Sequence, residues 1–281
     1  MNDIAPAESV ESWSGKDRGD ENFPVGSLLV SAGLRPHVHA FYAFARNADD
    51  IADSPTLAAA EKVARLDVME NVLLGRRAAG SPSATRLRAS LAETGASPQH
   101  AVELLVAFRR DANKQRYESW DELYDYCRYS AMPVGRHVLD LHGESRDTWE
   151  PSDALCTALQ VLNHLQDVRR DIDALDRCYL PLDLLRQFGG HVNDVRGAGE
   201  TAALRQVFNA LLDQCDTLNR LARDLPRRTR DRRLRLETAV IAGLSCRLAG
   251  RLRRGDPIAR RVRLTKTDAI ASLLAAIRFA P

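Results

Sequence analysis

The segment that most constrains the fold is Phe41 to Asp53, which reads FYAFARNADDIAD. Residues four apart lie above one another on an α-helix, so Asp49 and Asp53 share one face, with Arg46 one turn earlier. The apolar residues of the segment fall in the opposite register and predict a buried face. Two carboxylates at this spacing repel each other and weaken the helix unless a cation lies between them. The segment therefore predicts a helix that carries a cation site.

A second acidic segment, Gln160 to Asp171, reads QVLNHLQDVRRD and repeats this pattern. Asn163, Asp167 and Asp171 are spaced four apart and share one helical face, and Gln160 lies one turn before them. Carboxylate and amide oxygens suit Mg²⁺, which takes one or two carboxylates together with substrate phosphates. One acidic cluster alone is usually solvated surface. Two clusters, each with a polar partner on the same face, favour a shared Mg²⁺ site for a phosphorylated substrate.

Composition favours one all-α domain in this chain of 281 residues. Ala, Leu, Arg, Asp and Glu dominate, and β-branched runs are scarce. No apolar run approaches the roughly 20 residues that span a bilayer. Residues 1–20 are polar and lack the apolar core of a signal peptide, which predicts a disordered leader before a single domain of residues 21–281.

Proline positions predict where helices break. Pro36 precedes the first acidic helix, and Ser54-Pro55 ends it directly after Asp53. Pro133 lies inside a helical pattern and predicts a kink. The small residue Gly135 beside it is then expected to open a pocket or to let a long substrate chain pass.

Other kinds of site are not favoured. The five cysteines are odd in number, well separated and without a CxxC pair, which predicts reduced thiols in a cytoplasmic protein. His164 lies off the face of Asn163, which indicates a packed or solvated histidine. The chain has no HExxH or GxSxG motif, and Gly197 to Gly199 lacks the third glycine and the preceding strand of a nucleotide site.

Charge is unevenly distributed along the chain. From Arg220 to the C-terminus there are 17 Lys and Arg against 5 Asp and Glu, whereas the preceding 219 residues carry a net charge of −10. Such asymmetry is typical of contact with nucleic acid or with an anionic membrane. The chain has no nucleic-acid motif, so no nucleic-acid partner is expected. Two interpretations remain open: peripheral contact with the inner face of an anionic membrane, or arginines that solvate helices and pair with the acidic part.

Four segments resemble the squalene and phytoene synthase family, the head-to-head class of all-helical isoprenoid synthases. They are FYAFARNADDIAD, YCRYSAMPVG (Tyr126 to Gly135), QVLNHLQDVRRD and RCYLP (Arg177 to Pro181). Within the family, ENFPVGSLL near the start and QD in the second acidic motif most resemble the hydroxysqualene synthases of bacterial hopanoid pathways.

The resemblance implies an isoprenoid synthase fold, with helices around a central apolar pocket. It implies Mg²⁺ as the cofactor, bound by Asp49, Asp53, Asn163, Asp167 and Asp171, of which the four aspartates are the catalytic residues. Asp50 is expected to be a supporting charge. Contact with a prenyl diphosphate substrate is implied for Phe23, Tyr42, Arg46, Tyr129, Gln160 and Tyr179.

The implied reaction is Mg²⁺-dependent ionisation of presqualene diphosphate, rearrangement of the cation and capture of water to give hydroxysqualene. Gln166 stands where many relatives have Arg, AMPVG replaces the AGTVG of condensing relatives, and the late tyrosine of the family is missing. These departures disfavour phytoene synthesis. The alternatives are condensation of two prenyl diphosphates to squalene, dehydrosqualene or phytoene, a silent assembly factor, or a lipid-binding module. Companion pathway enzymes are expected partners.

Overall fold

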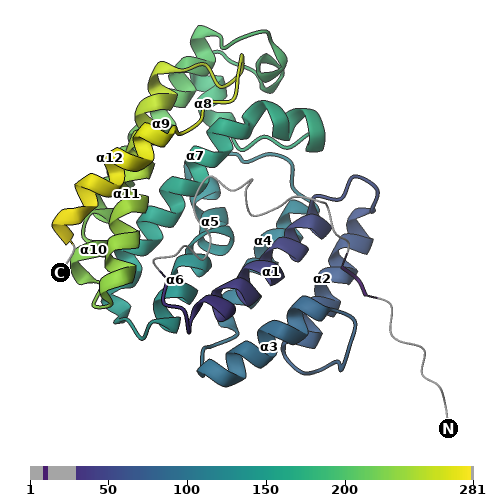
Figure 1. The fold of residues 1–281 in the computed structure, drawn as a ribbon. Coiled ribbons are helices and arrows are strands. Elements are labelled where there is room, and N and C mark those ends of the chain that lie inside the picture. The colour runs from purple at the N-terminus through teal and green to yellow at the C-terminus, as the bar shows by residue number, and fades with distance from the viewer. Residues whose placement is uncertain (1–8, 12–29, 280–281) are drawn as a thin grey trace. The chain divides into compact units, whose positions relative to one another are not determined.

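The computed structural model describes residues 9–11 and 30–279. The chain divides into two compact units, Met1–Asn113 and Lys114–Pro281, called here the N-terminal and C-terminal units. The described residues form helices and one isolated β-bridge, without a strand (Figure 1). The all-α prediction is therefore confirmed. Within the described part of the chain, no helix is long and apolar enough to cross a membrane.

The described residues of the N-terminal unit form four helices: α1 (Arg35–Ala52), α2 (Ala59–Leu73), α3 (Pro82–Thr94) and α4 (Gln99–Asp111). A proline in the first turn of α1 replaces an N–H that would have no partner in the helix, and Asp53 is the C-cap, as the proline positions predict. The other three helices pack against α1. Phe44 and Ile51 of α1 are completely buried in their shared core, which confirms the predicted buried face.

Residues 9–11 are held against the start of α3. The Glu11 carboxylate accepts hydrogen bonds from the Ser83 backbone N–H at 2.9 Å and from the Ser83 hydroxyl at 2.6 Å. A carboxylate is favourable there because the N-terminal end of a helix carries a partial positive charge. The rest of the predicted leader lies outside the described residues, and its boundary at residue 20 stays a prediction.

The C-terminal unit is built around one long helix, α7 (Trp149–Leu175), whose apolar side packs against α6, α9 and α11. Its buried stripe repeats at helical spacing and includes Ala158, Leu162 and Leu165. The other elements of the unit are α5 (Trp120–Ser130), α6 (Met132–Leu141), η2 (Arg146–Thr148), α8 (Leu182–Gln187), η3 (Val192–Arg196), α9 (Ala202–Ala222), α10 (Leu225–Arg228), α11 (Arg232–Arg254), α12 (Lys266–Ala276) and η4 (Ile277–Phe279).

The predicted kink is a break between two helices. Ala131 separates α5 from α6 with φ −124° and ψ −48°, and Pro133 occupies the first turn of α6. A Cβ atom on Gly135 would lie 2.4 Å from the Ser152 hydroxyl and 2.7 Å from the Cys156 sulfur of α7. Gly135 thus permits close packing of α6 on α7. The predicted opening beside Gly135 is wrong, because α7 fills that space.

The cysteines are all free, as predicted. Three are buried, Cys156 is partly buried and Cys246 is exposed. Four of the five thiols are therefore packed inside the fold. Burial raises the pKa of Cys156 to about 11, with a smaller contribution from Asp153. A thiol with a pKa this high is protonated at physiological pH.

Candidate active site

The first acidic motif is organised within α1 itself. The Arg46 guanidinium lies 2.8 Å from a carboxylate oxygen of Asp50 and 3.3 Å from one of Asp49. The side chain of Asp50 is only 5% exposed, whereas that of Asp49 is 35% exposed. The buried carboxylate thus holds the arginine in place, and the more exposed one faces solvent. This arrangement suits the supporting role predicted for Asp50 and the ligand role predicted for Asp49.

The end of α1 adds a further cation. The Lys62 ammonium group of α2 donates a hydrogen bond of 2.8 Å to the Ala52 carbonyl oxygen in the last turn. The C-terminal end of a helix carries partial negative charge, so a cation is favourable there. Asp53 follows directly as the C-cap, and it is partly buried. The predicted residues on this face repeat every three or four positions: Tyr42, Arg46, Asp49 and Asp53.

The second acidic motif lies on α7, and a distant segment supports it. The Arg261 guanidinium donates one hydrogen bond of 2.8 Å from a terminal nitrogen to the Asp167 carboxylate, and its Nε lies 2.6 Å from the other carboxylate oxygen as an ion pair. The neighbouring Gln166 side chain donates a hydrogen bond of 2.6 Å to the Val262 carbonyl oxygen. Hydrogen bonds in which both partners are charged are stronger than neutral ones, so this contact ties the segment of Arg261 to α7. Asn163 and Asp171 are partly buried on the same helix.

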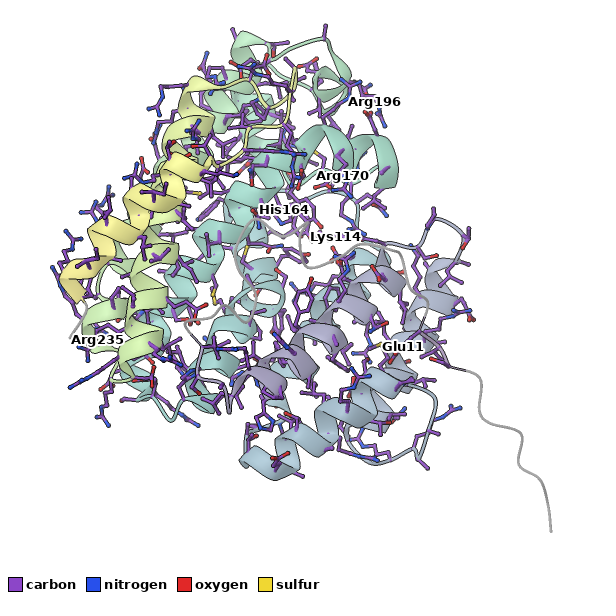
Figure 2. All side chains as sticks on the ribbon, viewed as in Figure 1. Glu11, Lys114, His164, Arg170, Arg196 and Arg235 are labelled. Atoms are coloured by element: carbon purple, nitrogen blue, oxygen red, sulfur yellow. The ribbon has the colours of Figure 1, made fainter. Side chains whose placement is uncertain are left out.

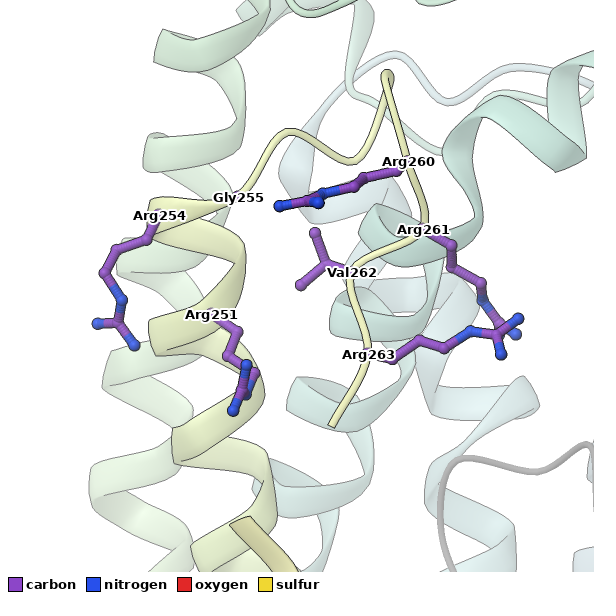
Figure 3. A pocket seen from close by; sticks show the side chains of 7 residues that line it. All are labelled: Arg251, Arg254, Gly255, Arg260, Arg261, Val262 and Arg263. Atoms are coloured by element: carbon purple, nitrogen blue, oxygen red, sulfur yellow. The ribbon is translucent and has the colours of Figure 1, made fainter. Parts of the chain in front are cut away.

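Arg261 belongs to a pocket of about 380 Å³ beside the C-terminal end of α11, called here the arginine pocket. In Figure 3, Arg254 and Arg261 lie on opposite sides of it. It is lined by Arg251, Arg254, Gly255, Arg260, Arg261, Val262 and Arg263. The pocket therefore places a dense positive charge next to the acidic motif of α7.

An aromatic cluster adjoins the second motif within the C-terminal unit. The Tyr179 ring stacks on the His164 imidazole with 3.4 Å between ring centres, and on Tyr117 at 5.4 Å. The ring of Tyr126 lies 5.5 Å from that of Tyr179. A parallel β-bridge between Arg116 and Cys178 brings the neighbouring tyrosines together. Tyr179, a predicted substrate residue, is thus fixed in a packed aromatic group.

A tight turn after α7 returns the chain to this cluster. Asp176 adopts the left-handed conformation with φ 49°, which Asp tolerates better than most residues. The Arg177 backbone N–H donates to the Asp171 carbonyl oxygen at 3.2 Å and closes the turn. Hydrogen bonds from arginine side chains, with Arg116 as the largest contribution, lower the pKa of the Asp176 carboxyl group. The turn therefore places Tyr179 back beside α7.

His164 links two predicted residues that are distant in sequence. Its Nε2 lies 3.1 Å from the side-chain nitrogen of Gln160, and its ring stacks on Tyr179. Figure 2 labels His164 on the ribbon of the C-terminal unit. Desolvation lowers the pKa of His164 to about 3, with a further contribution from the positive charge of Arg177. The ring is therefore neutral at physiological pH. Of the two interpretations that the sequence leaves open, a packed or a solvated histidine, the stacking supports the packed one.

The predicted site residues fall into separate groups in the structure. In the N-terminal unit, Tyr42, Arg46 and Asp49 lie on α1 and Asp53 is its C-cap. In the C-terminal unit, α7 carries Gln160, Asn163, Asp167 and Asp171. Tyr129 is partly buried on α5, and Phe23 lies outside the described residues. Sequence reasoning missed Arg261 and the central position of His164. The periodicity of α7 contains no signal for a partner far along the chain, although the excess of arginine after Arg220 was visible.

The predicted oxygen ligands on α1 and α7 suit an Mg²⁺ site to which each helix contributes only some of the ligands. In residues 9–11 and 30–279, no group of three or more His, Cys, Asp or Glu side chains is placed to hold a metal ion by itself. Mg²⁺ keeps water and substrate phosphates in its shell and needs only one or two carboxylates from each element. The oxygen ligands of α1 and α7 fit this chemistry. Their union in one site stays a prediction.

Comparison with known proteins decides the family. The profile of the family described as Squalene/phytoene synthase matches residues 16–268. The chain belongs to this family. It is similar to the hydroxysqualene synthase of Rhodopseudomonas palustris, with 45% identity over 267 residues that cover 95% of this chain and 91% of that protein. The hydroxysqualene synthase of Sinorhizobium fredii is 44% identical over 89% of this chain and 85% of that protein.

Solved structures agree with this assignment. The squalene synthase from Alicyclobacillus acidocaldarius has a TM-score of 0.74 and 34% identity, covering 84% of this chain and 90% of that one. A dehydrosqualene synthase in complex with a ligand has a TM-score of 0.79 at 21% identity, over 92% of each chain, and shows likeness of fold alone. The predicted isoprenoid synthase fold and enzyme class are confirmed.

Proposed function

We propose that this enzyme converts presqualene diphosphate into hydroxysqualene and diphosphate. The observation that carries the proposal is a contrast among relatives. Hydroxysqualene synthases are 42–45% identical over 89–95% of this chain. Phytoene synthases, such as that of Arabidopsis thaliana, are 32% identical or less over 62% of this chain. The departures at Gln166 and AMPVG favour the same choice.

The proposed reaction begins with departure of the diphosphate group. Mg²⁺, when bound, neutralises the charge that develops on the leaving oxygen. The residues that would hold it are Asp49, Asp53, Asn163, Asp167 and Asp171. The chain also supplies fixed positive charge beside both motifs, from Arg46 on α1 and from Arg261 beside α7. Preorganised charge of this kind stabilises a leaving anion without reorganisation.

The cation that remains must be captured by one water molecule. In the proposed step, the water oxygen forms a bond to the cationic carbon and releases one proton, with the departed diphosphate as the proton acceptor. The neutral pair of Gln160 and His164 offers both donors and acceptors beside the Tyr179 ring, which is what an ordered water needs. We infer that this pair orients the water.

Peripheral contact with the inner face of an anionic membrane is part of the proposal. Several arginines after Arg220 form ion pairs within the C-terminal unit, among them Arg251 with Asp268 and Arg253 with Asp216. Arg253 thus pairs with the acidic part of the chain, as the second interpretation predicts, whereas Arg251 pairs with an aspartate of the basic segment itself. The exposed arginines that line the arginine pocket, Arg254, Arg260 and Arg263, are the ones that we expect to contact the membrane. Companion enzymes that supply presqualene diphosphate and consume hydroxysqualene remain predicted partners.

Product analysis tests the reaction. The purified enzyme is incubated with Mg²⁺ and presqualene diphosphate, or with farnesyl diphosphate, each with and without a reduced nicotinamide. We expect hydroxysqualene and diphosphate from presqualene diphosphate without the nicotinamide. Efficient condensation of farnesyl diphosphate, or squalene that appears only with the nicotinamide, would establish the squalene synthase alternative. Absence of diphosphate release from both substrates would establish a silent assembly factor or a lipid-binding module.

The same assay tests the water-orienting pair through His164→Phe. Phenylalanine keeps the aromatic stack on Tyr179 and removes the ring nitrogens. Hydroxysqualene should fall relative to hydrocarbon products formed by proton loss, while diphosphate release continues. The matched control is Tyr124→Phe, which also removes one polar group from a partly buried aromatic residue of the C-terminal unit. An unchanged product ratio in His164→Phe contradicts the assignment of the pair.

A further inference from the structure

The helix α12 has its polar and apolar sides reversed relative to an ordinary surface helix. It packs along α11, and Figure 1 shows it in yellow beside that helix. The residues turned inward are Asp268, Ser272 and Ala276, spaced four apart. Four large aliphatic side chains, each 46–62% exposed, occupy the other side at helical spacing: Ile270, Leu273, Leu274 and Ile277. This set is called the α12 stripe.

The inward polar residues are fixed by partners, so the helix cannot rotate to bury its stripe. Asp268 accepts hydrogen bonds from Arg251 at 2.5 Å and from the Thr265 backbone N–H at 2.8 Å. The Ser272 hydroxyl accepts a hydrogen bond of 3.1 Å from Arg247. A Cβ atom on Gly243 would lie 3.2 Å from Ser272, so this crossing of the helices is close. Rotation of α12 would turn Asp268 and Ser272 toward solvent and take these acceptors away from the partly buried Arg247 and Arg251 side chains of α11, which is costly.

Cations lie at both ends of the α12 stripe. Lys266 occupies the same helical face one turn before Ile270, and Arg278 follows the last turn; both are exposed. The arginine pocket lies on the segment that leads into α12, and its exposed side chains have no carboxylate partner in the described part of the chain: Arg254, Arg260 and Arg263. Between residues 257 and 281 the sequence has one acidic residue, the buried Asp268.

We propose that the α12 stripe docks on the surface of an anionic lipid bilayer, with α12 in the plane of the interface. Aliphatic side chains inserted below the headgroups, with Lys and Arg beside them, are the combination by which interfacial helices bind anionic lipid. The inference rests on the proposed membrane contact and names the face that makes it. It does not depend on which reaction the enzyme catalyses.

A second copy of the chain fits this face less well. The α12 stripe exposes a few hundred Å², whereas stable interfaces bury about 800 Å² per partner. Two copies would also bring like-charged cations together, and an anionic surface attracts them. The matched family profile ends at residue 268. The α12 stripe lies after the matched residues.

Vesicle sedimentation of the full chain tests the proposal. The probes are phosphatidylcholine vesicles with and without phosphatidylglycerol, at low and high salt. We expect the wild type to bind the anionic vesicles and to dissociate as salt increases. Leu273→Ser combined with Leu274→Ser should weaken binding by roughly tenfold or more. The matched control is Leu221→Ser on α9, an aliphatic side chain that is 49% exposed, and it should bind like the wild type.

A positional readout accompanies sedimentation. Tryptophan placed by Leu274→Trp should be quenched by brominated lipid, whereas tryptophan placed by Leu221→Trp should not. Binding of the double serine variant at wild-type strength, or equal quenching at both positions, overturns the proposal. So does wild-type binding that ignores anionic lipid and salt. Failure to bind vesicles, with light scattering that shows the double variant converting a dimer to a monomer, assigns the face to a second copy.

The reaction is measured separately. In detergent solution, the serine and tryptophan variants should release diphosphate from presqualene diphosphate at the wild-type rate, which also shows that they fold. A wild type that binds vesicles through α12 but makes no hydroxysqualene contradicts the proposed reaction and leaves the docking face intact.

Discussion

The two acidic motifs have the same spacing but differ in how the fold supports them. On α1, Arg46 contacts acidic residues three and four positions away on the same helix. On α7, Asp167 contacts Arg261, which is 94 residues further along the chain. The contacts described for Arg46 are thus local to one helix, whereas the contact of Asp167 joins two distant segments of the chain. A pattern of acidic residues predicts where ligands lie, but it does not reveal what holds them.

Charge removal in each motif should have the largest effect. The single substitutions Asp49→Asn, Asp53→Asn, Asp167→Asn and Asp171→Asn should each lower turnover by about a hundredfold or more, because each weakens charge stabilisation at the leaving group. The comparison predicts different costs for stability. Asp53→Asn relieves the repulsion between Asp49 and Asp53 on α1 and should cost less stability than Asp167→Asn. Asp167→Asn leaves the guanidinium of Arg261 without its carboxylate and should cost about 1–3 kcal/mol.

Steady-state diphosphate release and urea unfolding measure the two quantities. Circular dichroism of each variant serves as the control for retained helix. Wild-type turnover in both Asp53→Asn and Asp167→Asn would rule out a metal site shared by the two motifs. Equal stability losses in those two variants would remove the contrast between local and distant support.

The contact between α7 and the arginine pocket should have an intermediate effect. Arg261→Ala removes the partner of a carboxylate that is 19% exposed, and it should lower stability by about 1–3 kcal/mol. Arg254→Ala is the matched control, because Arg254 lines the same pocket and is exposed, and it should stay within about 0.5 kcal/mol of the wild type. Trp120 and Trp149 report unfolding of the C-terminal unit by fluorescence.

A double-mutant cycle isolates the contact. If Arg261 acts through Asp167, the combined variant Asp167→Asn/Arg261→Ala should be more stable than the sum of the single losses predicts. Simple additivity would mean that Arg261 stabilises the pocket independently of α7.

Local pattern was sufficient for the helices and their ends, because proline positions and apolar periodicity act within a few residues. It placed the end of α1 at Asp53 correctly, and it marked Pro133 as an interruption, although it predicted a kink where the structure has a break between two helices. It failed where a contact joins distant segments. Gly135 looked like an opening and is a close helix crossing, since the Ser152 and Cys156 side chains opposite it belong to α7. The sequence around Arg261 contains no pattern that would identify it, and not Arg260 or Arg263, as the partner of Asp167.

The orientation of α12 is a further case. Its residues alternate at helical spacing, so the sequence reveals two faces but not which one turns inward. The choice is made by polar partners on α11, Arg247 and Arg251, which bind Ser272 and Asp268. Hydrophobic pattern alone would place the α12 stripe in the core.

The smallest effect expected is a pH dependence at the junction that leads from the arginine pocket into α12. Asp268 and Thr265 form a capping box at the start of α12, and Arg251 adds an ion pair. Burial opposes ionisation of Asp268, but the hydrogen bonds from Arg251 and Thr265 outweigh it and lower the pKa to about 2 from an ordinary value of 3.8. The unfolded chain therefore takes up this proton first as the pH falls.

The sign of the effect follows from this difference. The ionised carboxylate stabilises the fold fully above about pH 4, and its contribution is lost as the pH falls toward about 2. Asp268→Asn lacks this contribution and should be less stable than the wild type by about 1–2 kcal/mol at neutral pH, as for other helix caps. The difference between the two should shrink steadily below pH 4. Thr201→Ala, which removes the uncharged cap of α9, is the matched control. The stability loss of Thr201→Ala should stay constant with pH. If the loss of Asp268→Asn were also constant, the charge of the Asp268 carboxylate would not anchor the start of α12, which follows the Arg261 and Val262 contacts with α7.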